Sequence, residues 1–204
     1  MSATGANVEA VTPVVLAGGR GTRLGGINKA TIEIGGRRVI DRLLDALRPL
    51  AAGEIIVVNN DGSLAGLPGT RTVPDVDPGA GALMGLYSGL RAVRTPLATA
   101  TACDMPFVST VLLRALLELA VDHDAVVPVL AEQPEPLHAV YRVTCVPAIE
   151  AALAAGRKRL VAFFDDVRVR YVDEASVRAW DPDLVSFLNV NQPEDLARAQ
   201  ALAR

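Results

Sequence analysis

Three largely apolar runs constrain the fold of this chain more than any other feature. They lie at 11–17, 54–58 and 97–102, and each is followed by glycine, proline or polar residues. Strands that are apolar along their whole length are typical of a parallel sheet with both faces covered by helices. The sequence therefore predicts an α/β domain of three layers, α/β/α, around a mostly parallel sheet.

Segments with helical spacing separate these runs. Apolar residues recur every three to four positions from 40 to 47, and Pro49 ends that predicted helix. Ser109 is a typical N-cap residue and begins a helix predicted to extend to residue 121. Pro193, with Asn191 or Gln192 as the cap, begins the last helix. Further helices are predicted at 83–93, 146–155 and 159–164, and further strands at 31–34, 70–73, 124–130, 137–143 and 168–172.

Composition and charge exclude several classes of function. Half of the 204 residues are apolar and the net charge is −3, so neither wide disorder nor a general attraction to nucleic acid is expected. No stretch approaches the ~20 apolar residues of a membrane span. Residues 1–10 lack the features of a secretory signal and are expected to be a flexible leader before a single domain at 11–204. Cys103 and Cys145 lie far apart in apolar surroundings, which favours reduced, buried thiols and a cytoplasmic protein.

The stretch VVLAGGRGTRLGGINK, at 14–29, begins inside the first apolar run and continues into a segment rich in glycine. Glycines let the backbone approach a ligand closely, and consecutive N–H groups can surround an anion. Arg23 and Lys29 add positive charge that suits phosphate. A P-loop needs lysine where Ile27 stands, and a dinucleotide fingerprint needs glycine where Leu24 stands. The sequence therefore predicts a polyphosphate cradle of another kind, with a flexible loop of solvated basic residues as the alternative.

Residues that directly follow the predicted strands are candidate site residues, because ligands of parallel sheets bind beyond the carboxyl ends of the strands. Asp104, at the end of a buried strand, is the candidate Mg²⁺ ligand, and a turn cap before Pro106 is the alternative. Asn59 follows another buried strand and could read a nucleotide base through its amide, but a polar loop residue explains it equally well. The full set comprises Ala17, Gly18, Gly19, Asn59, Asp75, Cys103 and Asp104.

Three motifs resemble those of a known family. The pattern LAGG-x-x-x-R-x-G-x-x-K, at 16–29, resembles the signature of nucleotidyltransferases with a nucleotide-diphospho-sugar-transferase-like fold. The CDMP stretch at 103–106 is similar to the strand-end Asp-x-Pro element of those enzymes. FLNVNQPEDLARAQ, at 187–200, resembles the C-terminal segment of molybdenum cofactor guanylyltransferases. The resemblance extends from about residue 14 to residue 199.

This resemblance implies a function. The family transfers GMP from GTP to the phosphate of molybdopterin carrying molybdenum, releases pyrophosphate and requires Mg²⁺. It implies a Rossmann-like fold with a nucleotide-binding part at about 11–105 and an acceptor-binding part at about 106–204. GTP and molybdopterin are then the expected ligands, and proteins that insert molybdenum or mature molybdoenzymes are possible partners. Neither nucleic acid nor a membrane is expected as a partner.

The resemblance also assigns roles to residues of this chain. Arg23, Lys29 and Asp104 match catalytic positions, and Asp104 matches the metal ligand. Three of the positions also have a purely structural explanation. The basic turn at 157–159 could be a solvated face, His138 could be a structural residue, and Asn191 could cap the last helix. The implied nucleotide-binding residues are Leu16, Ala17, Gly18, Gly19, Lys29, Asn59, Asp75 and Asp104, and the implied acceptor-binding residues are Arg157, Lys158, His138, Asn189 and Asn191.

Two departures from the family pattern leave the nucleotide and the acceptor open. Asn28 stands where the family usually has aspartate, and 81–85 reads GALMG where GPLAG is usual. A transferase that uses CTP or another phosphorylated acceptor, and a non-catalytic nucleotide-binding relative, are therefore the alternatives. The expected chemistry needs no strong general base, because the attacking phosphate oxygen is already anionic. Catalysis should depend on positioning and charge neutralisation.

Overall fold

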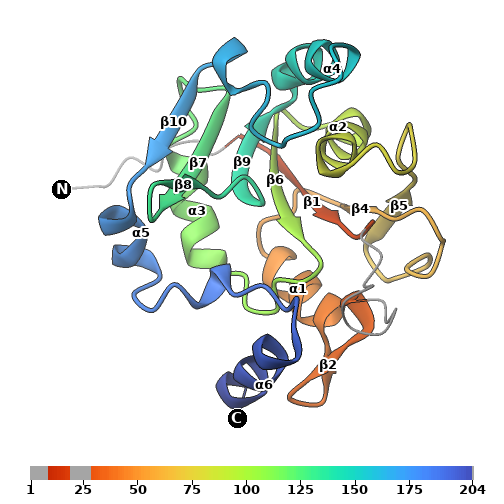
Figure 1. The fold of residues 1–204 in the computed structure, drawn as a ribbon, viewed down its shortest axis with the longest axis vertical. Coiled ribbons are helices and arrows are strands. Elements are labelled where there is room, and N and C mark those ends of the chain that lie inside the picture. The colour runs from red at the N-terminus through yellow and green to blue at the C-terminus, as the bar shows by residue number, and fades with distance from the viewer. Residues whose placement is uncertain (1–8, 19–28, 204) are drawn as a thin grey trace.

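A mixed sheet forms the centre of the computed structural model, which describes residues 9–18 and 29–203 (Figure 1). The strand order is β10-β7-β9-β6-β1-β4-β5, with β8 paired to β7. β1 pairs in parallel with both β4 and β6, so the predicted α/β class with a mostly parallel sheet is confirmed. The strands of this sheet are β1 (Val11–Leu16), β4 (Ile55–Val58), β5 (Thr70–Val73), β6 (Leu97–Ala102), β7 (Ala125–Leu130), β8 (Gln133–Pro134), β9 (His138–Arg142) and β10 (Val169–Val172).

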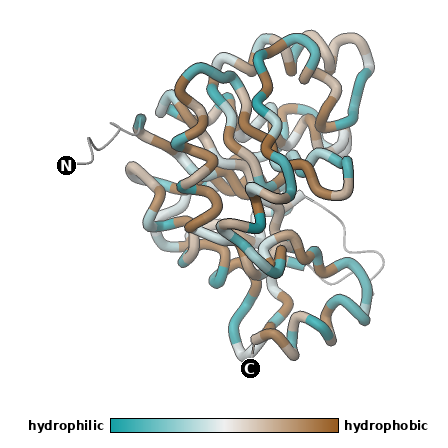
Figure 2. Tube along the Cα trace, turned by 90° about the vertical axis from the view of Figure 1, so that its left-hand side faces the viewer, coloured by the Kyte–Doolittle hydropathy of each residue, from teal (hydrophilic) through white to brown (hydrophobic). Residues whose placement is uncertain are grey.

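Helices cover both faces of the sheet. Val15 and Val57 pack in one apolar cluster with α1 and α3, whereas Val14 and Val58 pack in a second cluster with α2 and α4. Neighbouring residues of one strand therefore lie in opposite cores, which explains the largely apolar strands. In Figure 2, hydrophobic segments run through the body of the molecule and hydrophilic segments gather mostly at its outer turns. The helices are α1 (Val39–Leu47), α2 (Ala82–Ala92), α3 (Thr110–Glu118), α4 (Val146–Ala154), α5 (Glu174–Trp180) and α6 (Pro193–Leu202).

Strand β9 runs against its neighbours, a feature that the sequence did not predict. It lies between β6 and β7 and pairs antiparallel with both. The connection from β7 is too short for a helical crossover, and β7 first turns into β8 through two residues with positive φ, Ala131 and Glu132. As a result, the start of β9 lies at the same edge as the carboxyl ends of β1, β4 and β6.

Short elements complete the chain. A two-stranded hairpin, β2 (Glu33–Ile34) and β3 (Arg37–Arg38), follows the 3₁₀ turn η2 (Lys29–Thr31). Further 3₁₀ turns in the described residues are η3 (Val143–Cys145), η4 (Phe164–Asp166) and η5 (Val185–Phe187). In the described part of the chain, no helix has the length and apolar character to cross a membrane.

Two predictions about helices were wrong, and one helix was missed. The helix predicted at 159–164 is a series of turns that ends in η4, with Phe163 and Phe164 buried in the core. The helix begun by Ser109 ends at Glu118 and not at residue 121, and the guanidinium of Arg142 binds the carbonyl groups of the turn that follows it. Helix α5 was not predicted, although the carboxylate of Asp173 caps it by accepting from Ser176 N at 2.8 Å.

Candidate active site

A cleft of about 430 Å³ opens at the carboxyl ends of the parallel strands. The glycine turn after β1, the loop after β5, the first turns of α2 and the end of β6 form its walls. This is the edge at which ligands of such sheets bind. The lining residues are Leu16, Gly18, Lys29, Val58, Asp75, Gly79, Gly81, Ala82, Gly85, Ala102, Cys103, Asp104 and Leu137.

The turn after β1 is held by backbone hydrogen bonds to both neighbouring strands. Ala17 N donates to Val58 O at 2.8 Å, and Cys103 N donates to Leu16 O at 3.0 Å. Ala17 is buried, whereas Gly18 is exposed to the cleft. The predicted phosphate cradle thus begins at a fixed point on the cleft wall. Gly19, Arg23 and Asn28 lie outside the described residues, so their roles stay predictions.

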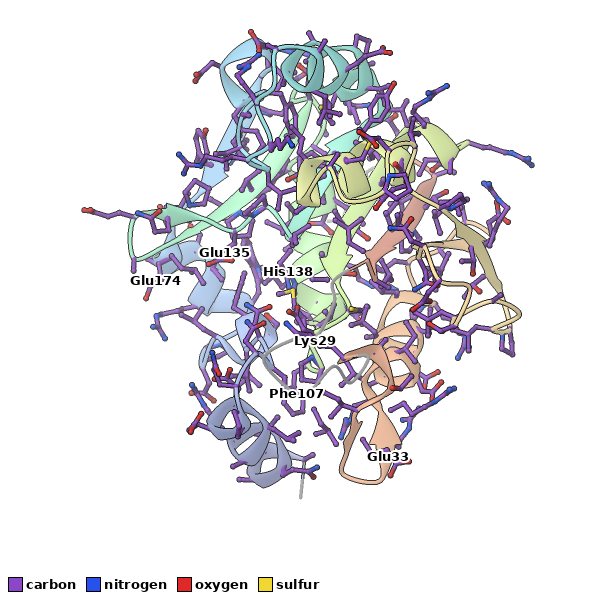
Figure 3. The ribbon with its side chains drawn as sticks, turned by 45° about the vertical axis from the view of Figure 1, so that its right-hand side comes forward. Lys29, Glu33, Phe107, Glu135, His138 and Glu174 are labelled. Atoms are coloured by element: carbon purple, nitrogen blue, oxygen red, sulfur yellow. The ribbon has the colours of Figure 1, made fainter. Side chains whose placement is uncertain are left out.

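Lys29 joins two segments that are distant in the sequence. Its Nζ lies 3.0 Å from Asp104 Oδ2 and also donates a hydrogen bond to Asn191 Oδ1. The side chains of Lys29 and Asp104 are only 17% and 18% exposed, so their charges interact with little solvent screening. Lys29 lies near the middle of the molecule, below His138 in the view of Figure 3. The structure therefore brings three of the predicted site residues into direct contact.

The segment at 189–191 docks directly on Asp104. Val190 N donates to the carbonyl oxygen of Asp104 at 2.8 Å, and Asn189 Nδ2 turns back to Phe187 O at 3.3 Å. Gln192, and not Asn191, is the N-cap of α6. The helix-cap alternative for the Asn191 side chain is therefore wrong, and that side chain is available to Lys29.

Asp75 is held by Asn60, which the sequence did not predict as a site residue. Asn60 Nδ2 donates to Asp75 Oδ2, and Asp75 N donates to Asn60 Oδ1, both at 2.7 Å. This two-point contact orients the carboxylate. The carboxylate lies between the glycine turn and α2, since a Cβ added at Gly18 or at Gly85 would be 3.6 Å from one of its oxygens. The consecutive asparagines after β4 were the only signal for Asn60, and they did not separate its role from that of Asn59.

Asn59 supports the site from beneath its surface. Its side chain is almost fully buried, and its Nδ2 donates to Ala17 O at 3.2 Å. Among the described residues its Oδ1 has no hydrogen-bond partner, and the same is true of Asp75 Oδ1. Buried polar atoms without partners are uncommon and often mark sites of function. The predicted nucleotide-binding roles of Asn59 and Asp75 are compatible with these positions and stay predictions.

His138 was predicted to contact the acceptor, and its position contradicts that role. The ring is fully buried and lies on Phe187, with ring centroids 4.8 Å apart. The neighbouring Leu137 lines the cleft in its place. Burial lowers the pKa of His138 to about 4, so the ring is neutral at pH 7. A ring without exposed surface cannot touch a ligand in this conformation.

The two basic residues predicted to bind the acceptor have different surroundings. The Arg157 guanidinium donates to Ala162 O and lies 3.2 Å from Asp166 Oδ2, so it is bound to its own loop. Lys158 is exposed and passes the rim of the cleft, where a Cβ added at Gly81 would lie 3.9 Å from its Cβ. Of the pair, Lys158 is therefore the better placed for an anionic acceptor.

Cys103 lies in the cleft wall but is not a reactive nucleophile. Burial and the negative charge of Asp104 raise the pKa of its thiol to about 12. A thiolate is the reactive form, so this thiol is inert at neutral pH. Cys145 is also buried, and both cysteines are free, as predicted.

A divalent cation fits the donor set of the cleft. In the described part of the chain, no cluster of three or more His, Cys, Asp or Glu side chains could hold a metal by itself. Asp104 is one of two carboxylates that line the cleft, and the other, Asp75, is bonded to Asn60. Mg²⁺ typically takes one or two protein carboxylates and completes its shell with phosphate oxygens and water. Asp104 is the residue that would hold it together with a bound nucleotide.

A glycine turn, a lysine and a strand-end aspartate line one cleft beyond a parallel sheet, the arrangement expected of a nucleotidyltransferase. Residues 13–170 match the family model of the MobA-like NTP transferase domain. The chain is 38% identical over 195 residues to the molybdenum cofactor guanylyltransferase of Desulfosudis oleivorans, which covers 95% of this chain and 96% of that protein. The chain therefore belongs to the molybdenum cofactor guanylyltransferase family.

Solved structures agree with this assignment. Molybdopterin-guanine dinucleotide biosynthesis protein A from Archaeoglobus fulgidus superposes with a TM-score of 0.81 at 28% identity, covering 94% of this chain and 97% of that one. A Mycobacterium tuberculosis protein solved in complex with manganese shares the fold, with a TM-score of 0.64 at 20% identity over 94% of this chain and 98% of that one.

Proposed function

We propose that the chain transfers GMP from GTP to the phosphate of molybdopterin that carries molybdenum. The proposal depends most on one observation, the contact of Lys29 with Asp104 and Asn191 beside the cleft. This contact joins residues from both end motifs that resemble the guanylyltransferases. The family relationship supplies the substrates, because the relative from Desulfosudis oleivorans carries that activity in its name.

In the proposed reaction, an oxygen of the acceptor phosphate attacks the α-phosphorus of GTP. A new phosphorus–oxygen bond forms, the bond between the α-phosphorus and the bridging oxygen breaks, and pyrophosphate leaves with that oxygen. Negative charge builds up on the phosphate oxygens as the bond breaks. Lys29 supplies a positive charge at the cleft wall, where its low exposure strengthens the interaction. The nucleophile carries no proton that must be removed, so no histidine is needed.

Asp104 is the proposed ligand of the divalent cation on which such transferases depend. Mg²⁺, when bound, would neutralise phosphate charge and orient the leaving pyrophosphate. The manganese complex of the Mycobacterium tuberculosis protein supports a divalent site in this fold, and Mg²⁺ is our proposal for this chain. The backbone bond from Val190 to Asp104 O fixes the strand end that carries the carboxylate.

The acceptor is proposed to bind on the side of the cleft where Leu137 and Lys158 lie. Leu137 gives that wall an apolar surface, and Lys158, whose Cβ lies beside Gly81 of the cleft lining, is proposed to supply the cation for the phosphate. Partner proteins that receive the labile product, and a cytoplasmic location, are further proposals that follow from the family.

The deciding experiment measures pyrophosphate release from each nucleoside triphosphate in the presence of Mg²⁺ and molybdopterin. Release is expected with GTP and at most weakly with CTP, ATP or UTP. Preferential turnover of CTP would instead establish a cytidylyltransferase. If no triphosphate turned over while GTP still bound, the chain would be a non-catalytic nucleotide-binding relative.

A further inference from the structure

Helix α6 and the β2–β3 hairpin lie side by side at the lower end of the molecule (Figure 1). One side chain of α6 bonds to the hairpin backbone at two points. Gly35 N donates to Gln200 Oε1 at 3.1 Å, and Gln200 Nε2 donates to Glu33 O at 2.7 Å. Because Gln200 both accepts and donates, it fixes the distance and the orientation of α6 relative to the hairpin.

Both joined elements lead directly to the cleft. The hairpin follows η2, which begins at Lys29, and α6 follows Asn191. Lys29 Nζ donates to Asn191 Oδ1 at the cleft end of the same two segments. The two segments are thus connected twice, once beside the cleft and once through Gln200 at the far end.

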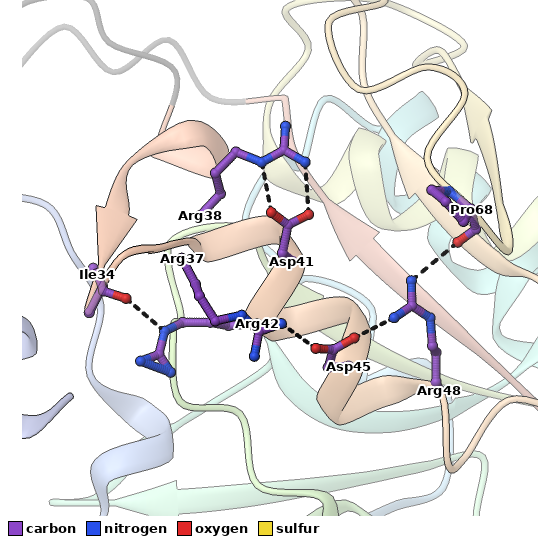
Figure 4. Close-up of polar contacts among 8 residues, drawn as sticks. All are labelled: Ile34, Arg37, Arg38, Asp41, Arg42, Asp45, Arg48 and Pro68. Atoms are coloured by element: carbon purple, nitrogen blue, oxygen red, sulfur yellow. Dashed lines mark hydrogen bonds and ion pairs between the residues drawn. The ribbon is translucent and has the colours of Figure 1, made fainter. Parts of the chain in front are cut away.

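The hairpin is anchored on its other side by α1 (Figure 4). Arg42 Nε donates to Ile34 O at 3.0 Å, and Arg38 binds both carboxylate oxygens of Asp41 at 2.7 and 2.8 Å. The hairpin is therefore attached to α1 on one side and to α6 on the other. A second ion pair joins Arg37 to Asp45 on α1.

The close approach of α6 to the hairpin depends on a glycine. Gly35 has a φ of +58°, and a Cβ at this position would lie 2.9 Å from Ala203 Cβ at the end of α6. Both the backbone conformation and the available space therefore require glycine. This close fit holds the last turn of α6 where Gln200 can reach the hairpin.

The first turn of α6 is hydrogen-bonded to the backbone of Asn191. Asp195 Oδ2 accepts from the backbone N–H groups of Asn191 and Gln192, both at 2.9 Å. A shift of α6 would therefore move Asn191, and with it one of the two groups that hold the Lys29 ammonium. The other group is the carboxylate of Asp104.

We propose that Gln200 is a positioning residue that sets the place of Lys29 through α6 and Asn191. The kinetic part of this proposal depends on the function proposed above, because Lys29 is there the residue that neutralises phosphate charge. The structural part, that Gln200 controls the surroundings of Lys29, can be tested without any substrate.

The sequence offers a direct readout, because it holds two lysines, Lys29 and Lys158. Lys158 is exposed and is a suitable internal reference for acylation with an N-hydroxysuccinimide acetate ester, followed by mass spectrometry. In the wild type, Lys29 should react much more slowly, since its nitrogen is shielded and hydrogen-bonded. In Gln200→Met, which removes both hydrogen bonds, the Lys29 to Lys158 labelling ratio should rise about fivefold, the factor that about 1 kcal/mol represents.

Further variants separate positioning from simple stability. Asn191→Ala should raise the ratio by a similar factor, and Gln200→Met should add little to it in the double variant. Gln200→Glu keeps the acceptor for Gly35 N and loses the donor to Glu33 O, so an intermediate ratio is expected. Arg198→Gln, an exposed change on the same helix, is the matched control and should leave the wild-type ratio.

Kinetics then test the consequence for the reaction. Gln200→Met should lower kcat for pyrophosphate release about fivefold and leave KM for molybdopterin unchanged, at a temperature well below its Tm. A lower Tm with an unchanged labelling ratio, or additive effects of Gln200→Met and Asn191→Ala, would overturn the proposal. Labelling that follows the proposal in a protein without GTP turnover would refute the proposed function alone.

Discussion

The carboxylate of Asp104, beside Lys29 in the cleft, is the proposed ligand of the divalent cation. Asp104→Asn keeps the shape of the residue but removes the charge that would hold a divalent cation. We expect kcat to fall about 100- to 1,000-fold, the usual effect of losing one electrostatic group from an active site. Steady-state pyrophosphate release and Mn²⁺ binding followed by electron paramagnetic resonance would measure the two effects.

Asp77→Asn is the matched control for that change. Asp77 is an exposed aspartate of the loop before α2 and does not line the cleft. Its variant should keep both metal binding and turnover. Full turnover of Asp104→Asn at the same Mg²⁺ concentration would contradict the assignment of the metal ligand.

Neighbouring basic residues at 157 and 158 should behave differently when each is replaced by alanine. Lys158→Ala removes an exposed cation at the cleft rim, so KM for molybdopterin should rise about tenfold with KM for GTP unchanged. Arg157→Ala breaks contacts to Ala162 O and Asp166 and should chiefly lower the Tm. Equal effects of the two variants on KM for molybdopterin would contradict the distinction.

At the scale of the elements, the packing of α2 on β1 gives a testable case. Replacing a glycine in a helix by alanine usually adds stability, but a Cβ at Gly89 would lie 2.4 Å from Val14 Cγ1. Gly89→Ala should therefore reduce the free energy of unfolding by about 1–3 kcal/mol, measured by urea denaturation. Adding Val14→Ala removes the clash, so the double variant should be more stable than the sum of the two single changes predicts.

The local patterns of the sequence predicted most elements for physical reasons that act over a few residues. Ser109 caps α3 through a hydrogen bond from Leu112 N, and Pro193 begins α6, as expected. The missed features involve partners outside the local pattern. The short connection from β7 reverses the direction of β9, but its insertion between β6 and β7 depends on pairing with a strand that precedes it by more than 30 residues. The turn after α3 is bonded to Arg142, 24 positions beyond Glu118.

The same distinction applies to the candidate site. The positions after β1, β5 and β6 could be predicted, because parallel strands carry their carboxyl ends to one edge of the sheet. The contacts of Lys29 with Asp104 and Asn191 span 75 and 162 residues, and no local pattern encodes such pairs. Only the resemblance of both end motifs to one family suggested that they serve one site. The burial of His138 likewise depends on Phe187, which belongs to a distant turn.

At the scale of the whole molecule, the buried His138 predicts how stability depends on pH. Its pKa is lowered by burial from 6.5 to about 4, so the unfolded chain binds the proton more tightly than the folded one. Stability is therefore fully present above pH 6.5 and is lost as the pH falls from there towards 4. The loss should reach about 3 kcal/mol, since one pKa unit corresponds to about 1.4 kcal/mol.

Urea denaturation of the wild type between pH 7.5 and about 4.5 would measure this loss, and two variants assign it to one residue. His138→Phe removes the titrating ring and keeps an aromatic group against Phe187, so the free energy of unfolding should vary much less over this range. His123→Phe is the matched control, because the sequence holds two histidines and this one lies partly exposed beyond α3. It should keep the wild-type slope. An equal loss of stability on acidification in His138→Phe and in the wild type would show that other groups, and not the buried ring, make the protein sensitive to acid.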